Sequence, residues 1–210
     1  MVIKIGLENI NIFFQRKSIK KTYLRVTNKR EILITSPLNL KEEDLKQLIN
    51  ENYEWLKAKL EKVKIIDIGK DEFMLFGKKY QVKYNKVKQI EINNDIIVTD
   101  KISSIELYGI ELISKRFNEM VCELQIPFKP IINFRKMHSR WGVCHYKDNK
   151  IVINKVLIHV PMRIVEYVMY HELAHFKEPN HSKSFYQELF KICPDHRKLK
   201  SQLSEYSSLL

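Results

Sequence analysis

Long apolar runs are missing from this chain of 210 residues. No stretch approaches the roughly 18 consecutive apolar residues of a membrane-spanning helix, so no transmembrane segment and no membrane partner are expected. The first ten residues carry charges at Lys4 and Glu8 and lack the apolar centre of a secretory signal. Internal repeats and low-complexity linkers are also missing from the sequence. With 44% hydrophobic residues, the chain can still build a sizeable core.

Cysteine is scarce. Cys122, Cys144 and Cys193 are odd in number and far apart, which does not fit a disulfide framework. Free thiols are typical of a reducing compartment, so a cytoplasmic location is expected.

Negative charge is in deficit, because 25 Asp and Glu residues stand against 37 Lys and Arg residues. The excess of 12 positive charges is spread over both halves of the chain. A diffuse positive surface attracts polyanions without specificity, so it indicates a nucleic-acid partner only weakly. Residues 124–147 contain no acid at all, yet they contain five basic residues: Lys129, Arg135, Lys136, Arg140 and Lys147.

The first 64 residues read as strands followed by one helix. Alternating apolar and polar residues over 18–36 predict a hairpin whose turn contains Asn28. Residues 39–64 have apolar residues at helical spacing, with acids early and lysines late. That pattern predicts a single amphipathic helix whose charges suit its dipole.

The middle of the chain reads as further strands and a second helix. Residues 73–98 predict strands that turn at Gly77 and at 93–95. Residues 103–125 predict a long helix.

The last 80 residues predict a small sheet followed by helices. Residues 131–146 are expected to form a strand and a loop, and residues 150–160 another strand. Pro161 suits the first position of a helix over 161–177, which is apolar nearly all round and should be buried. One or two further helices follow, interrupted at Pro194.

Three histidines and a glutamate crowd the segment MYHELAHFKEPNHSKSF, residues 169–185. Positions four apart share a helix face, so His171 and His175 can direct their imidazoles at one ion. Neutral imidazole is a good zinc ligand. Glu172 is rotated by about 100° from His171, which suits a general base acting on water better than a ligand.

His181 is the expected third ligand, provided that the helix breaks before it. Pro179 biases the residue before it away from helical angles, and Asn180 tolerates a left-handed turn. Ser182 or Ser184 can then cap the next helix. A catalytic zinc site has three protein ligands and water, which is the number of ligands expected here.

The short pattern HExxH also occurs by chance, so its surroundings decide between a metal site and an ordinary helix. The neighbouring residues are apolar: Val165, Val168, Met169, Leu173 and Ala174. They predict that both imidazoles and the carboxylate are buried, at about 1–3 kcal/mol for each polar group left without a partner. A bound metal removes that cost, and the chain break with His181 adds to the case for zinc.

These motifs are similar to those of a known family. SRWGVC at 139–144, followed by HELAHFKEPNHSKSF, resembles the YgjP-like metal-dependent hydrolases, which are relatives of the SprT-like zinc metalloproteases. The leader segments KKTYLRVTNKREILITSP and EWLKAKL resemble the same family more loosely. The family's block often reads RWGSC, whereas here Val143 precedes Cys144.

The resemblance implies that His171, His175 and His181 are zinc ligands and that Glu172 is the catalytic glutamate. Together with the pattern of elements, it predicts an α+β fold in two domains. Residues 1–100 would form a β-rich part with one long helix. Residues 101–210 would form a zincin-like helical metal domain with a small sheet.

The predicted function is metal-assisted hydrolysis, most simply by a metallopeptidase. Zn²⁺ lowers the pKa of the water that it holds toward 7, and Glu172 accepts the proton. Four side chains are candidates for contacts with the substrate or transition state: Arg140, His138, His145 and Tyr170. The strand near Lys150–Ile153 is expected to pair with an extended peptide at its edge.

Two other functions stay open. If residues 124–147 lie beside the metal, their cations would suit a nucleotide substrate, which predicts a metal-dependent phosphohydrolase such as a pyrophosphatase. If the protein is a peptidase, the resemblance to SprT-like enzymes suggests that its substrates are proteins bound to DNA. A zinc-stabilised binding module without catalysis is the third possibility, although a structural site has no use for Glu172.

Overall fold

A computed structural model describes residues 2–6, 8–27, 30–63 and 69–210. These residues form the expected α+β fold, with six α-helices among them. None of the helices in these ranges is both long and apolar enough to cross a membrane.

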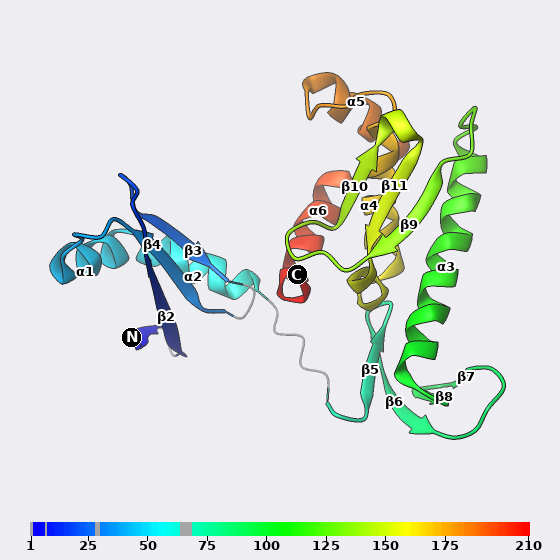
Figure 1. The fold of residues 1–210 in the computed structure, drawn as a ribbon, viewed down its shortest axis with the longest axis horizontal. Helices are drawn as coiled ribbons and strands as arrows, with labels where there is room; N and C mark the ends of the chain where they lie inside the picture. The colour runs from blue at the N-terminus through cyan, green and yellow to red at the C-terminus, as the bar shows by residue number, and fades with distance from the viewer. Residues whose placement is uncertain (1, 7, 28–29, 64–68) are drawn as a thin grey trace. The chain divides into compact units, whose positions relative to one another are not determined.

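The chain divides into two compact units. The first unit contains residues 1–66 with 204–209, and the second contains residues 67–203 with 210. The sequence predicts a boundary at residue 100, between a β-rich region and a hydrolase domain. A division into compact units does not test that boundary, so it stays a prediction. Both units are drawn in Figure 1.

A four-stranded sheet begins the first unit. Its order is β1-β2-β4-β3, with β2 and β4 parallel and the other neighbouring pairs antiparallel. The strands are β1 (Val2–Ile5), β2 (Glu8–Arg16), β3 (Tyr23–Val26) and β4 (Ile32–Ser36). The predicted hairpin is confirmed as β3 and β4, while its turn residue Asn28 lies outside the described residues.

Two helices, α1 (Glu42–Glu51) and α2 (Tyr53–Lys62), stand where one was expected. The break falls at Asn52, whose side-chain Nδ2 donates to the Leu48 carbonyl at 2.8 Å and competes with the helical backbone. Apolar residues from both helices and three of the strands form the core of this unit: Ile5, Ile10, Ile12, Ile32, Ile34, Leu45, Ile49, Leu56 and Leu60.

The second unit starts with another four-stranded sheet, in the order β5-β6-β8-β7. Its strands are β5 (Glu72–Leu75), β6 (Lys78–Tyr84), β7 (Glu91–Asn93) and β8 (Ile96–Thr99). The expected turns are confirmed, with positive φ at Gly77 and at Asn94. A Cβ on Gly77 would lie 2.6 Å from Pro161, so this turn packs tightly against the start of the following helical region.

The two four-stranded sheets share one topology, although the sequence shows no repeat. In each, the second and fourth strands are parallel neighbours, the other pairs are antiparallel, and a helix follows the fourth strand. The match extends to single hydrogen bonds: Lys17 N–H donates to the Ser36 carbonyl and Asn85 N–H to the Thr99 carbonyl, both at 2.9 Å. Ser36 and Thr99 are both buried at the ends of their strands. The fold therefore contains a structural repeat that the residues do not reveal.

The third sheet has the order β10-β11-β9. It consists of β9 (Ile131–Arg135), β10 (Gly142–His145) and β11 (Lys150–Asn154). The prediction that a peptide pairs near Lys150–Ile153 is wrong, because β11 is central and both of its edges are already paired. Within this sheet the outer strands are β9 and β10.

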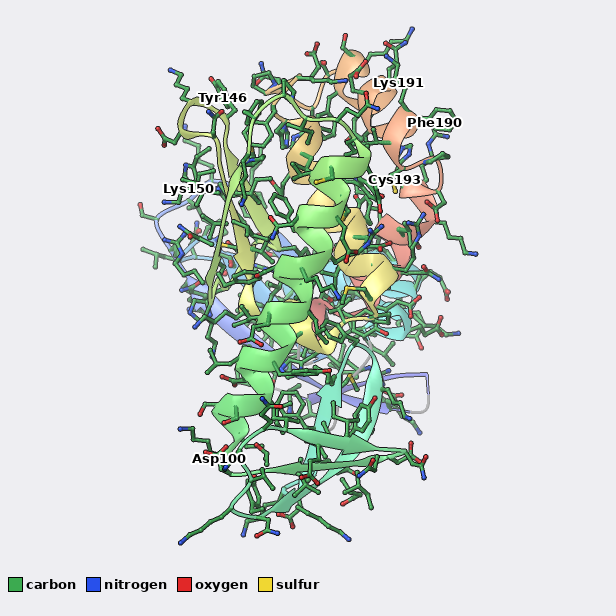
Figure 2. All side chains as sticks on the ribbon, turned by 90° about the vertical axis from the view of Figure 1, so that its right-hand side faces the viewer. Asp100, Tyr146, Lys150, Phe190, Lys191 and Cys193 are labelled. Atoms are coloured by element: carbon green, nitrogen blue, oxygen red, sulfur yellow. The ribbon has the colours of Figure 1, made fainter. Side chains whose placement is uncertain are left out.

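Helices α3 (Ile102–Glu123) and α4 (Met162–Ala174) pack against each other, and they contact β9 and the β10–β11 pair respectively (Figures 1 and 2). An ion pair joins them, in which Arg116 Nε lies 2.6 Å from Glu166 Oε1. The expected strand over 150–160 is only half right, because the buried Asn154 side chain accepts a hydrogen bond from Val156 N–H and starts a 3₁₀ turn.

Two ten-residue helices follow α4. They are α5 (Lys183–Ile192) and α6 (His196–Glu205), and they are separated near Pro194 as predicted. Short 3₁₀ turns complete the described chain: Tyr146–Asp148, Lys155–His159 and Ser207–Leu209.

Candidate metal centre

The end of α4 carries His171, Glu172 and His175. The helix is buried along most of its length, as predicted, but it ends at Ala174, before the expected end at residue 177. The N–H groups of Lys177 and Glu178 both donate to the Ala174 carbonyl, at 3.0 and 3.1 Å. This tight turn, and not Pro179, closes the helix at Ala174, so that His175 is its C-cap residue.

The chain then returns toward α4. Ser182 N–H donates to the Asn180 carbonyl at 2.8 Å, and Asn180 keeps a negative φ, so the left-handed turn expected there is not used. Ser182 caps α5 as predicted, because its hydroxyl accepts a hydrogen bond from Phe185 N–H. The cap fixes the start of α5 directly after His181.

Three imidazoles converge at this turn. Candidate ligand atoms of His171, His175 and His181 all lie within 4.8 Å of one another. The Nε2 atoms of His171 and His181 are 2.9 Å apart. Zinc–nitrogen bonds of about 2.0–2.1 Å place two ligand atoms about 3.3 Å apart in a tetrahedron, so the spacing suits a single small ion.

The surroundings of the Nδ1 atoms of His171 and His175 indicate which nitrogen of each ring is available to a metal. His175 Nδ1 lies 3.0 Å from the Glu178 carbonyl, which can accept its proton in a hydrogen bond and leaves Nε2 for a metal. His171 Nδ1 is buried and has no hydrogen-bond partner among the described residues. Three rings that present nitrogen to one point form a donor set that fits a divalent transition metal such as zinc.

Phe185 packs against all three imidazoles. Its ring centroid lies 4.9 Å from that of His171, 4.5 Å from that of His175 and 4.8 Å from that of His181. The ring is fully buried, so it holds the histidine cluster in a rigid apolar surrounding.

Glu172 lies beneath strand β10. A Cβ on Gly142 would be 2.7 Å from Glu172 Oε1, so the absence of a side chain at Gly142 makes room for the carboxylate. Glu172 as a whole is 6% exposed. The close approach of Glu172 therefore explains why position 142 is a glycine, which the sequence motif alone does not explain.

Burial also sets the protonation of the cluster. It lowers the pKa of His171 to about 3, and the neighbouring His175 and His181 add to that shift. Burial lowers the pKa of His175 as well. Both rings are therefore neutral at pH 7, which is the form that binds metal.

The same burial raises the pKa of Glu172 to about 7, against a hydrogen bond from Cys144 N–H and the positive charge of Arg140. A carboxyl group with a pKa near 7 can accept and release a proton at neutral pH. Its chemistry thus suits general acid–base work.

The four residues predicted to contact the substrate or transition state lie in different surroundings. Arg140 is exposed and close enough to act electrostatically on Glu172. His138 and His145 are exposed, and no described interaction joins either to the cluster. Tyr170 is buried, and the charges that act on its hydroxyl are mainly those across the α3–α4 contact, so we leave it out of the site.

Asn154 places Arg140 near the cluster. Its side-chain Nδ2 donates to the carbonyls of Arg140 and Met137, both at 2.8 Å, and its Oδ1 accepts from Met137 N–H. The buried amide therefore fixes the backbone of the loop before β10.

Besides Phe185, sequence reasoning missed two further aromatic residues beside the histidines. Tyr167 lies one turn before His171, with ring centroids 6.2 Å apart, and burial raises its pKa to about 12. Tyr186 lies 6.5 Å from the His181 ring. The spacing of four residues between Tyr167 and His171 was a usable signal, since such residues share a helix face.

Comparison with known families places the protein among the metallopeptidases, a class that requires a divalent metal. The model of the YgjP-like, metallopeptidase domain family matches residues 20–206. The chain therefore belongs to the YgjP-like family, and the resemblance noted in its motifs is confirmed. A comparison with curated proteins gave no match.

Two solved structures are similar to part of the chain. One is the metallopeptidase zymogen of Pyrococcus abyssi abylysin, with a TM-score of 0.40 and 19% identity over 43% of this chain and 90% of that chain. The other is the metallopeptidase zymogen of Methanocaldococcus jannaschii jannalysin, with a TM-score of 0.39 and 23% identity over 43% of this chain and 92% of that chain. Each likeness covers less than half of the present chain.

Proposed function

We propose that this protein is a zinc-dependent peptidase in which Glu172 is the general base. His171, His175 and His181 would hold the ion. The proposal is carried by one observation: a buried carboxyl group lies one residue from an imidazole of a three-histidine cluster. A structural metal site would need no acid at that position.

The metal, when bound, would polarise the scissile carbonyl and make water more acidic. Glu172 would take the proton of the attacking water and pass it to the leaving nitrogen, for which a pKa near 7 is well suited. Arg140 would keep positive charge near the carboxylate and the developing oxyanion.

The outer strand β10 would orient the substrate. Trp141 carbonyl accepts from Asn154 N–H, so alternation along the antiparallel pair turns the backbone groups of Gly142 and Cys144 away from β11. An extended peptide could pair with the backbone groups of Gly142 and with the Cys144 carbonyl, because the Cys144 N–H already donates to Glu172. This edge replaces the one expected on the neighbouring strand.

The first prediction concerns Glu172→Gln in the zinc-loaded protein. We expect peptide cleavage to fall by about 10²–10⁴-fold, because proton transfer loses its acceptor, while bound zinc and folding stay unchanged. Zinc content, circular dichroism and kcat on a quenched peptide library measure these quantities. Glu111→Gln, which removes an exposed carboxylate on α3, is the matched control and should keep full activity.

Three outcomes would contradict the proposal. Undiminished cleavage by Glu172→Gln would remove Glu172 as the base. Phosphate release from nucleoside triphosphates, lost in that variant and without any peptide cleavage, would assign a phosphohydrolase. Metal-dependent folding without turnover of either substrate class would leave a binding module.

A further inference from the structure

A cavity of about 640 Å³ lies between α5 and α6, close to the histidine cluster. Its lining includes cationic and aromatic side chains: Lys183, Tyr186, Phe190, Lys191, His196 and Arg197. Figure 2 shows Phe190 and Lys191 on α5, well separated from Tyr146 and Lys150. The cavity is therefore on a different side of the unit from the β10–β11 connection.

Aromatic rings connect the cavity to the cluster. The Tyr186 ring centroid lies 6.5 Å from that of His181 on one side and 6.3 Å from that of His196 on the other. Lys183 follows His181 by two residues. A peptide whose cleaved bond lay at the histidines could thus place a nearby side chain in the cavity.

Each helix that borders the cavity has a cation in its first turn. Lys183 is the first residue of α5 and Arg197 the second of α6, and neither helix has an acid in its first turn. The N-terminus of a helix is partially positive, so a cation there is disfavoured and an anion is favoured. Such local conflicts are expected where a binding function compensates for them.

These cations are also left without partners. Lys191 is paired with Glu188, but no ion pair among the described residues involves Lys183 or Arg197. His196 is 5% exposed; its Nδ1 contacts the Cys193 carbonyl at 3.1 Å, and no described hydrogen bond uses its Nε2. The cavity thus contains two cations without an ion-pair partner, beside the mostly buried His196, and an anionic group could engage them.

Apart from these cations, the walls of the cavity are apolar. The rings of Tyr186 and Phe190 are 39% and 57% exposed, more than is usual for side chains of this size. A methylene stem could pack on the rings while its carboxylate meets the cations.

We propose that this cavity is a subsite of the peptidase that takes a carboxylate of the substrate, as an acidic side chain near the cleaved bond. The inference rests on the proposed function. It assigns the substrate class as peptides with Glu or Asp at one fixed position from that bond.

Paired peptides that differ only by Glu or Gln test this subsite in the zinc-loaded full chain. With the acidic residue moved through successive positions, we expect one position at which Glu raises kcat/KM about tenfold over Gln. The double substitution Lys183→Gln, Arg197→Gln should bring that ratio close to one. Lys198→Gln, in the same first turn but outside the cavity, should leave the ratio unchanged. Peptides with amidated ends separate a side-chain carboxylate from the C-terminal one.

Binding to the Glu172→Gln protein supplies a readout independent of cleavage. Tighter binding of the Glu peptide, dependent on Arg197, would support the subsite even if no peptide were cleaved, and would then overturn only the proposed reaction. Equal cleavage and equal Kd for Glu and Gln peptides at every position would overturn the subsite. So would a preference only for the free C-terminus, or Arg197-dependent binding of ATP with no peptide preference.

Discussion

The two four-stranded sheets share one topology, but the helices that follow them differ. The first leads into α1 and α2, which break at Asn52 and bury the apolar face of their own sheet. The second leads into α3, an unbroken helix of 22 residues that carries Arg116 to α4. The same topology therefore serves as a self-contained unit in one case and as a support for a candidate metal centre in the other.

Histidine is distributed just as unevenly. All seven histidines follow residue 137, and residues 1–66 contain none. Each unit also has one tryptophan, Trp55 in the first and Trp141 in the second. The substitutions Trp141→Phe and Trp55→Phe therefore leave a fluorescent reporter in one unit at a time, and unfolding of the two units can be followed separately.

Metal removal should give the largest difference between the units. A ligand present at 1,000 times its Kd stabilises the folded state by about 4 kcal/mol. Chelation should therefore lower the midpoint of the transition reported by Trp141 and leave that reported by Trp55 unchanged. An equal shift of both reporters would show that the units unfold together.

Core substitutions at equivalent strands sharpen the comparison. Ile34 on β4 and Ile97 on β8 are both 0% exposed. Replacement by Ala should cost about 2–5 kcal/mol in each case, through lost burial and the cavity left behind. Urea unfolding of the single-tryptophan proteins should show the cost of Ile34→Ala at Trp55 and that of Ile97→Ala at Trp141. Crossed effects would contradict the division into two units.

Acid should weaken the second unit before the first. Burial lowers the pKa of His159, whose Nδ1 lies 2.6 Å from the Met74 carbonyl. The unfolded chain binds the proton near pH 6.5 but the folded chain resists it, so stability falls as the pH drops below about 6.5. In metal-free protein, His171 and His175 act in the same direction, whereas the raised pKa of Glu172 opposes them and offsets part of the slope. His159→Gln should flatten part of the slope between pH 7 and pH 5 at Trp141, and a slope of equal size at Trp55 would contradict this.

The smallest effect is expected at the helix break. Asn52→Ala removes the side-chain bond to the Leu48 carbonyl and replaces a poor helix former with the best one. We expect a gain in helical circular dichroism and a change of about 0.5 kcal/mol in the stability of the first unit. An unchanged spectrum would mean that packing, and not Asn52, keeps α1 and α2 apart.

Local signals made much of the fold predictable. The turns at Gly77 and Asn94, the buried helix α4 and the cap at Ser182 depend on neighbouring residues, and each was found where expected. The convergence of the three histidines followed from helix spacing and a chain break. The exact end of α4 did not follow, because backbone hydrogen bonds to Ala174 close the turn earlier than proline would.

Non-local features were not predictable. Strand order within a sheet is set by pairing between distant segments, so the central position of β11 and the repeated topology left no pattern in the residues. Phe185 looks like any other core residue in the sequence, and only the structure shows it against the three imidazoles. Tyr170 precedes His171 directly, and a helix turns adjacent residues by about 100°, so the two side chains lie on different faces of α4.

Strand β10 is only four residues long. If a substrate pairs with it, the shared ladder can span no more than the outward groups of two residues, and so few main-chain bonds give little affinity. Such an enzyme would hold flexible chain segments only briefly. Its choice of target would then depend on side chains, and well-folded proteins, whose strands are already paired, would be poor substrates.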